Sequence, residues 1–483
     1  MEDGKLLKSW VEKEKNVPPL YGSKSKLVNP WDAYVRWSVS IPGELENRTY
    51  LNKEIWNSWQ SFNFSRLTKK GLCYVTGKHT KIASQHPRKI KHAGDGSKLI
   101  SANDSSGFTF RGRFTDKSGD QVCGVGFDVT QKAHNALRWL IARQGIRFGD
   151  LAIVAWSVAG GDLPALFKNT SDLFDEDFEE SEVNLKDKKT VSTSKSLADA
   201  LNKKLKGYQA KLDPTDRIII LAVDSATPGR MAITYYRVLA QSEFLERVDK
   251  WHTECAWEQN YSKDKKFLGA PSSYEVAIAA YGSQADDKLK IATYNRLLPC
   301  IIENQPIPID LLQNCINRVN NRLGLDNWEW QKNLGITCAL YRKHKLQTEH
   351  IDYTMSLERT RTTRSYLYGR LLAIADVLEQ AALAQDENRP TNAARLMQRF
   401  SQRPYDTWTS IYLSLDSYKK RLKANKPGLL TNFEKEIDEV KNLFKAEHFT
   451  NDTKLKGEFL LGYHCQRSDL YTSKKEQLEE TSN

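Results

Sequence analysis

The 483-residue chain is predicted to be an α+β protein, in which a mixed α/β N-terminal region precedes a predominantly α-helical region that ends in a helical bundle. Three observations predict this fold class. The runs DLAIVAWSV at residues 150–158 and RIIILAV at residues 217–223 are continuous and apolar, as is typical of buried strands. From about residue 242 onward, helical periodicity dominates and glycine becomes rare. Prolines then separate a series of amphipathic segments.

The elements of the first 240 residues follow from local patterns. Residues 31–41 alternate apolar and polar side chains and predict a strand. Residues 53–64, KEIWNSWQSFNF, predict a helix that carries Trp56, Trp59 and Phe62 on one side. Residues 129–144 predict an amphipathic helix. Further elements are expected as a strand pair at 107–126, a helix at 192–211 and a strand at 232–238.

The remainder of the chain predicts helices at 242–257, 273–281, 288–303, 309–323, 329–344, 361–385, 391–401, 405–423 and 430–446. Their breaks coincide with prolines such as Pro271, Pro299 and Pro404. We therefore expect a basic mixed α/β region at residues 1–240 and a helical connecting region at 241–354. Residues 355–483 have the length of a bundle of four or five helices.

The positive charge is concentrated in the first third of the chain. Residues 1–150 hold 25 Lys and Arg against 14 Asp and Glu, whereas the whole chain has a net charge of +12. Within residues 66–113, eleven cations face two acids, and glycine, proline and serine interrupt the segment. A loop-rich surface of this charge indicates an anionic partner, and a phosphate backbone is the usual one. The alternative is a solvated face without a partner.

Composition excludes several classes of protein. No run of 18 apolar residues is present, so no membrane-spanning segment is predicted, and the charged N-terminus does not resemble a signal peptide. Seven scattered cysteines without a C-x-x-C pair argue against disulfides and zinc ribbons and favour the cytoplasm. The acidic segment at 171–182 predicts a solvated loop, or alternatively a mimic of duplex DNA that shields a basic groove.

Motifs of catalysis are missing from the sequence. There is no P-loop, no G-x-S-x-G elbow and no H-E-x-x-H helix, so no cofactor or metal is predicted. Asp213, Asp216 and Asp224 flank a strand but lack the clustered partners of a two-metal nuclease. His79, His86 and His92 match no zinc spacing.

Several separate motifs carry a family resemblance. CYVTGKHTKIASQHPRKIK, from Cys73 onward, is followed by SKLISAN, which ends at Asn103. Later blocks are DSATPGRMAITYYRVL with WHTECAW, NRLLPCIIENQPIP, SYLYGRLLAIADVLEQAA and GEFLLGYHCQR. Over roughly residues 30–475 the chain resembles the large subunit of type I-C CRISPR surveillance (Cascade) complexes, of the Dvulg subtype.

The resemblance implies a non-enzymatic DNA-binding subunit in an antiviral ribonucleoprotein complex. Such a subunit would sense the short PAM on double-stranded target DNA, support R-loop formation and recruit the helicase-nuclease. Base pairing with the guide RNA would recognise the rest of the target. The implied partners are the guide RNA, the backbone and handle-binding subunits, the small subunit and the helicase-nuclease.

We expect the phosphate contacts to come from cations of the basic segment and of one later turn. They are Lys78, Lys81, Arg88, Lys89, Lys91, Arg111, Arg113 and Arg230. For Arg230 the alternative is a pair with a nearby acid such as Asp224. Asn103 and Gln85 are the candidates for PAM readout, since amides pair well with adenine in the major groove.

Two further expectations come from the resemblance. Members of this family carry a longer segment before the Cys-x-Val-Thr-Gly step than the 72 residues present here, so this is either a short variant or a chain without an N-terminal portion. The helical C-terminal part can also be made separately, as the small subunit. Met355 is the candidate internal start and would give a product of 129 residues.

Two other classes of function remain open at this stage. One is a stand-alone nucleic-acid-processing enzyme, such as a nuclease with an unrecognised site. The other is a protein scaffold with little DNA contact.

Overall fold

The computed structural model describes residues 36–40, 42–43, 47–100, 124–175, 194–227, 229–262, 265–383 and 389–480. The chain forms two compact units. The first comprises Met1–His86 with Ser101–Lys132, and the second comprises Pro87–Ile100 with Ala133–Asn483. The predicted region boundaries after residues 240 and 354 both fall inside the second unit.

The first unit contains a helix and a small hairpin. Helix α1, Lys53–Ser65, begins after Asn52, whose side chain accepts hydrogen bonds from the backbone N–H groups of Glu54 and Ile55. Strands β1, Lys70–Leu72, and β2, His79–Lys81, pair antiparallel. Helix α1 confirms the prediction for residues 53–64. Of the strand predicted at 31–41, residues 36–40 form only an isolated bridge between Ser38 and Arg48.

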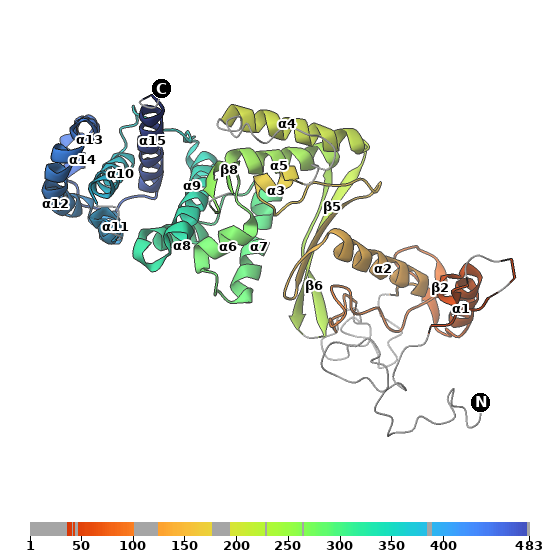
Figure 1. Ribbon diagram of the computed structural model, residues 1–483. Coiled ribbons are helices and arrows are strands. Elements are labelled where there is room, and N and C mark those ends of the chain that lie inside the picture. The colour runs from red at the N-terminus through yellow and green to blue at the C-terminus, as the bar shows by residue number, and fades with distance from the viewer. Residues whose placement is uncertain are drawn as a thin grey trace, which may run out of the picture. The chain divides into compact units, whose positions relative to one another are not determined.

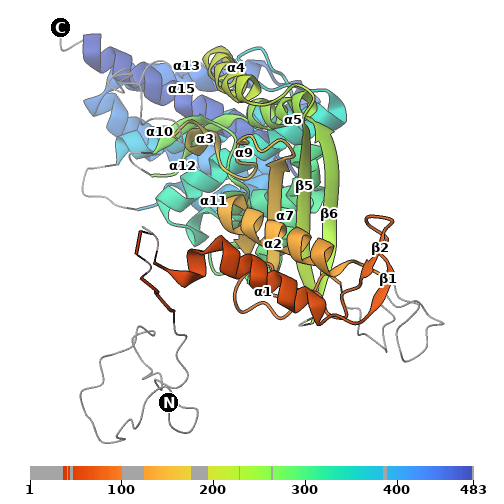
Figure 2. The same cartoon turned by 90° about the vertical axis from the view of Figure 1, so that its right-hand side faces the viewer.

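The second unit is built on a four-stranded antiparallel sheet in the order β3-β4-β5-β6. The strands are β3, Ile146–Phe148, β4, Leu151–Ser157, β5, Arg217–Thr227, and β6, Arg230–Ala240. Figure 2 shows β5 and β6 as long paired strands. The strands predicted at 150–158, 217–223 and 232–238 are confirmed as β4, β5 and β6.

Both faces of the sheet are covered, which explains why β4 and β5 are continuous apolar runs. On one face, Ile153 and Ile220 pack into the main core with Phe244 of α5, Gln241–Glu254. On the other face, Val154 and Val223 pack against Leu137 and Ile141 of α2, Phe127–Gln144. The sheet is therefore the middle layer between helices.

Helices and one short hairpin continue the main core. The hairpin of β7, Trp257–Asn260, and β8, Lys266–Gly269, was not predicted from the sequence. The other elements of this part are α3, Thr170–Asp175, α4, Ser194–Lys211, α6, Ser273–Tyr281, α7, Asp287–Ile302, α8, Ile309–Asn320, η3, Arg322–Gly324, and α9, Asn327–Glu349.

The C-terminal helices surround α10, Arg364–Ala382, in which Ser365–Glu379 are all buried. They gather apart from the β5–β6 hairpin (Figure 1). Their members are α11, Asn392–Gln402, α12, Pro404–Asn425, α13, Pro427–Asn442, α14, Ala446–Thr450, and α15, Glu458–Glu480. The α+β fold class, with a helical C-terminal region, is as predicted.

The last two family-like motifs meet between α10 and α15. A Cβ atom at Gly369 would lie 2.0 Å from the carbonyl oxygen of Phe459, and one at Gly462 would lie 2.2 Å from that of Tyr366. Glycine at both positions therefore allows the two helix backbones to touch. Beside them, Arg370 Nε donates to the Gln466 side chain at 2.7 Å, and Tyr463 donates to Asp376.

A buried ion pair joins the connecting region to these helices. Arg322 of η3 donates to Asp376 at 3.0 Å and to the Tyr463 hydroxyl at 3.0 Å. Burial alone would raise the pKa of Asp376, but the guanidinium groups of Arg322 and Arg467 outweigh it, so that the pKa is lower than usual. Residues on either side of position 355 thus share one ionic cluster.

Candidate nucleic-acid interface

The segment Pro87–Ile100, which holds much of the predicted basic surface, is anchored to the sheet of the second unit. Lys98 forms a parallel bridge with Arg230 at the start of β6: its N–H donates to Gly229 at 3.2 Å, and its carbonyl accepts from Met231 at 2.9 Å. The side chain of Ile90 is 1% exposed and packs with Leu137 and Ile141. Backbone pairing and apolar burial therefore fix both ends of this segment.

Lys91 lies inside the fold. Its ammonium group donates to the main-chain oxygen of Asp150 at 2.7 Å and to the hydroxyl of Ser225, and its side chain is 1% exposed. Asp95 lies 3.9 Å from the same ammonium group. A cation that is enclosed in this way has no surface to offer to a phosphate in this conformation.

Asp95 organises the turn around Lys91. Its carboxylate accepts from both the N–H and the hydroxyl of Ser97. Burial opposes ionisation of Asp95, but the hydrogen bonds from Ser97 and the charge of Lys91 prevail and lower its pKa. Sequence reasoning missed this role. The available signal was that Asp95 is the single acid between residues 71 and 103.

Arg138 of α2 holds the two cations that precede Lys91. Its guanidinium donates to the main-chain oxygens of Arg88 and Lys89, each at 2.9 Å. Lys89 has a φ of +63°, a left-handed conformation that is uncommon for lysine, and its N–H donates to the Asp95 carbonyl at 3.0 Å. These contacts fix the backbone, while both side chains are exposed.

The anchored segment therefore alternates between interior and surface. Ile90, Lys91, Asp95 and Ser97 point inward, whereas Arg88, Lys89 and His92 are exposed. Arg230, next to Lys98 across the bridge, is exposed as well. The result is a surface of cations on a rigid support, which suits phosphate binding. We call Arg88, Lys89, Lys98 and Arg230 the sheet-end cations.

The remaining predicted contacts of the described residues belong to the first unit. The Cys73–Gly77 motif forms the turn of the β1–β2 hairpin: Gly77 has a φ of +67°, and its N–H donates to Cys73 at 2.8 Å. This turn leaves Lys78 exposed. Lys81 instead donates to the main-chain oxygens of Phe64 at 2.6 Å and Ser65 at 3.2 Å. Lys81 thereby satisfies carbonyls at the end of α1.

Gln85 is exposed, whereas the neighbouring His86 is buried with Nδ1 2.8 Å from the Thr130 hydroxyl. Asn103, Arg111 and Arg113 lie outside the described residues, as do residues 176–182 of the acidic segment.

The groups considered for catalysis do not converge. Asp216 is buried and accepts from Ala159 N–H at 3.1 Å, while Asp213 accepts from Thr215 in a turn. Asp224 lies eight residues beyond Asp216, which amounts to about 26 Å along an extended strand. Within the described part of the chain, no three His, Cys, Asp or Glu side chains gather to hold a metal ion.

These features define an α+β protein with an anchored cationic surface that suits a nucleic acid. In the described part of the chain, no helix is long and apolar enough to cross a membrane. The family model of the CRISPR-associated protein Cas_Csd1 matches residues 5–471, and the chain belongs to this family. No curated protein matches the chain.

Proposed function

We propose that the chain is the non-catalytic large subunit of a type I-C CRISPR surveillance complex of the Dvulg subtype. It would bind double-stranded target DNA, sense the PAM, and support R-loop formation and recruitment of the helicase-nuclease. Membership of the Cas_Csd1 family supports a role in a Cascade-type complex. The observation that carries the DNA-binding role is the exposed pair Arg88 and Lys89 on a segment that is anchored by the buried side chains of Ile90, Lys91 and Asp95.

In this proposal the duplex phosphates contact Arg88, Lys89, Arg230 and Lys78, all of which are exposed. Arg111 and Arg113 belong to the proposed contacts on the sequence pattern alone. Lys81 and Lys91 hold the backbone of the basic surface in place and do not contact phosphates themselves, because their ammonium groups donate to main-chain oxygens of the protein. Gln85 and Asn103 remain the proposed PAM-reading residues.

The proposed partners are the guide RNA, held through the complex, the backbone and handle-binding subunits, the small subunit and the helicase-nuclease. No cofactor or metal belongs to the proposal, and the complex would work in the cytoplasm. The small subunit would be made from an internal start at Met355. Co-purification of a fragment that begins at residue 355, its loss in Met355→Leu and its persistence in Met397→Leu would test this start.

Duplex binding over a range of salt concentrations tests the DNA-binding role. The variant Arg88→Ala/Lys89→Ala removes two proposed phosphate contacts. The negative slope of the logarithm of the association constant against log salt should therefore become shallower by about 2. Lys203→Ala/Lys206→Ala, two exposed lysines of α4, is the matched control and should keep the parent slope.

An unchanged slope in Arg88→Ala/Lys89→Ala would contradict the proposed contacts. Cleavage of DNA by the purified chain with a divalent metal would favour a nuclease instead. Assembly and target binding that survive neutralisation of the basic segment would favour a scaffold.

A further inference from the structure

Helix α1 of the first unit carries a row of exposed aromatic side chains. Along this helix, which the structure describes in full, no residue is buried. Trp56, Trp59 and Phe62 are 51%, 62% and 54% exposed, and Ile55 is 49% exposed. Large apolar side chains that cluster on one exposed helix commonly mark a binding surface.

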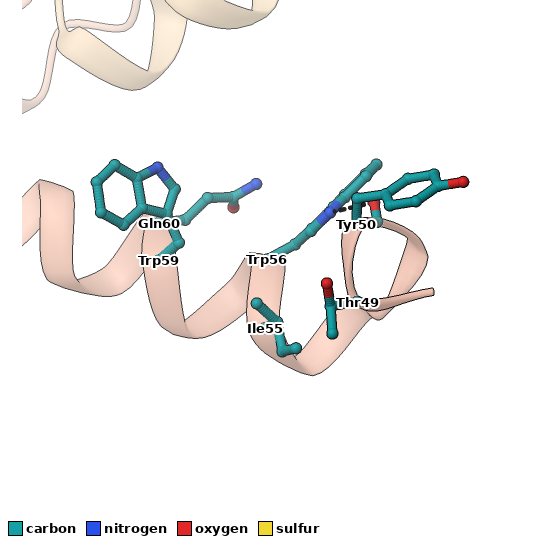
Figure 3. A pocket seen from close by; sticks show the side chains of 6 residues that line it. All are labelled: Thr49, Tyr50, Ile55, Trp56, Trp59 and Gln60. Carbon is teal, nitrogen blue, oxygen red and sulfur yellow. Dashed lines mark hydrogen bonds between the residues drawn. The ribbon is translucent and has the colours of Figure 1, made fainter. Parts of the chain in front are cut away.

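The aromatic side chains enclose a shallow pocket. It has a volume of about 410 Å³ and is lined by Thr49, Tyr50, Ile55, Trp56, Trp59 and Gln60. Figure 3 shows the indole rings of Trp56 and Trp59 rising from the same side of the helix, with the amide of Gln60 near Trp59. The pocket thus presents flat rings together with an amide that can donate and accept hydrogen bonds.

The pocket is held in place by local contacts. Trp56 Nε1 donates to the main-chain oxygen of Tyr50 at 2.8 Å, which orients its ring. The side chain of Asn52 caps the N-terminus of the helix. Arg36 lies 4.9 Å from the Tyr50 ring centre and Arg66 lies 5.8 Å from that of Phe62. Cations therefore border the aromatic row at both ends.

The charge of this unit indicates which kind of ligand the α1 pocket binds. Its described residues include nine Lys or Arg but only two acids, Glu54 and Asp128. A partner of this unit has to cover the aromatic rings and also neutralise the surrounding cations, and an apolar protein helix would do only the first. A single-stranded nucleic acid satisfies both properties, because its bases stack on aromatic rings while its phosphates meet cations.

We infer that the α1 face, Tyr50, Trp56, Trp59 and Phe62, binds unpaired bases of a single-stranded nucleic acid. The inference rests on the proposed function, since opening a target duplex produces such a strand. It adds a stacking site on the first unit to the phosphate contacts proposed for the sheet-end cations of the second unit. Gln60 would contact the edge of the base seated at Trp59.

Binding of a fluorescent 20-nucleotide oligo(dT) and of a duplex of equal length to the full chain tests the inference. Trp56→Leu and Trp59→Leu keep an apolar side chain but remove the stacking ring. Each should weaken oligo(dT) binding about tenfold, as expected for one lost base stack, and leave duplex binding unchanged. Trp59→Phe should retain most of the oligo(dT) affinity.

The control is Trp328→Leu on α9, whose indole is 58% exposed, and it should bind oligo(dT) like the parent. Parent-like oligo(dT) binding by both α1 variants, or equal affinity of Trp59→Leu and Trp59→Phe, would overturn the inference. If those variants instead lost a co-purifying protein subunit, the α1 face would be a protein-docking surface. Ring-dependent oligo(dT) binding without any duplex binding would support the α1 site and contradict the proposed function.

Discussion

The ammonium group of Lys91 donates to the main-chain oxygen of Asp150 at 2.7 Å, from a side chain of which 1% is exposed. This contact ties the basic segment Pro87–Ile100 to the loop that precedes β4. Lys91 therefore differs in role from its neighbours Arg88 and Lys89, although all three are cations within four residues. The buried lysine holds the segment, and the exposed cations are available to a partner.

Replacement of Lys91 should cost stability. Lys91→Met leaves Asp95 without its cationic partner and Asp150 O without its donor, so the free energy of unfolding should fall by about 3 kcal/mol. Urea unfolding would measure this loss, and limited proteolysis should show faster cleavage within residues 87–100. Lys89→Met, on the exposed side, should stay within about 0.5 kcal/mol of the parent. Equal stabilities for both variants would contradict the anchoring role.

The close contact of α10 with α15 predicts that alanine is harmful at Gly369 but not at Gly428, a glycine of α13 that serves as the control. Gly369→Ala places a methyl group against the backbone of Phe459, so it should destabilise the chain by about 3 kcal/mol or more. Gly428→Ala, near the start of α13, meets nothing within 4 Å and should be neutral or stabilise by up to about 1 kcal/mol. Thermal unfolding of both variants measures the difference. A parent-like Gly369→Ala would show that the helices do not pack this closely.

The buried ion pair of Arg322 with Asp376 should contribute more to the free energy of unfolding than an exposed ion pair does. Arg322→Met leaves the buried carboxylate of Asp376 with only the guanidinium of Arg467, at 4.0 Å, as a cationic partner, and should cost about 3 kcal/mol. Arg296→Met breaks the more exposed pair with Asp310 and should cost less than about 1 kcal/mol. Arg322 lies 4.1 Å from the ring centre of Trp330, so tryptophan fluorescence can follow unfolding. Similar losses in both variants would contradict the burial of the Arg322–Asp376 pair.

Stability should fall in mild acid because of His252. Burial lowers the pKa of His252 to about 4, from an ordinary value near 6.5. Between these two pH values the imidazole binds a proton in the unfolded chain but not in the folded chain. The contribution of the neutral His252 to the free energy of unfolding is therefore complete above pH 6.5 and is lost as the pH falls towards 4. The total loss is about 3 kcal/mol.

His252→Gln removes this titration and should flatten the dependence of unfolding free energy on pH, by up to about 1.4 kcal/mol per pH unit in this window. Urea unfolding at pH 5 and pH 7 measures it. A steep parent-like dependence in His252→Gln would show that His252 is not the titrating group.

The periodic elements could be predicted from the sequence because burial on two faces, as in β5, or on one stripe, as in α2, repeats along the chain. The short hairpin of β7 and β8 could not. Trp257 prolongs the apolar pattern of the preceding helix, so residues 242–257 resemble one helix that in fact ends at Glu254.

The candidate site shows a similar limit. The density of cations indicated a basic surface, but the direction of each side chain in a loop follows no period. The burial of Lys91 depends on Ser225, which lies 134 residues away. Only the fold brings these two residues together.

In the proposed function, this chain senses the PAM on double-stranded DNA. The most direct measurement is binding of the reconstituted complex, with its guide RNA, to duplexes whose target is constant and whose flanking bases are randomised. We expect a preference for particular flanking bases that disappears when this chain is left out and weakens in Gln85→Ala. Gln209→Ala, at an exposed amide of α4, is the control and should keep the preference. The same flanking preference in a complex without this chain would contradict the PAM-sensing role proposed for it.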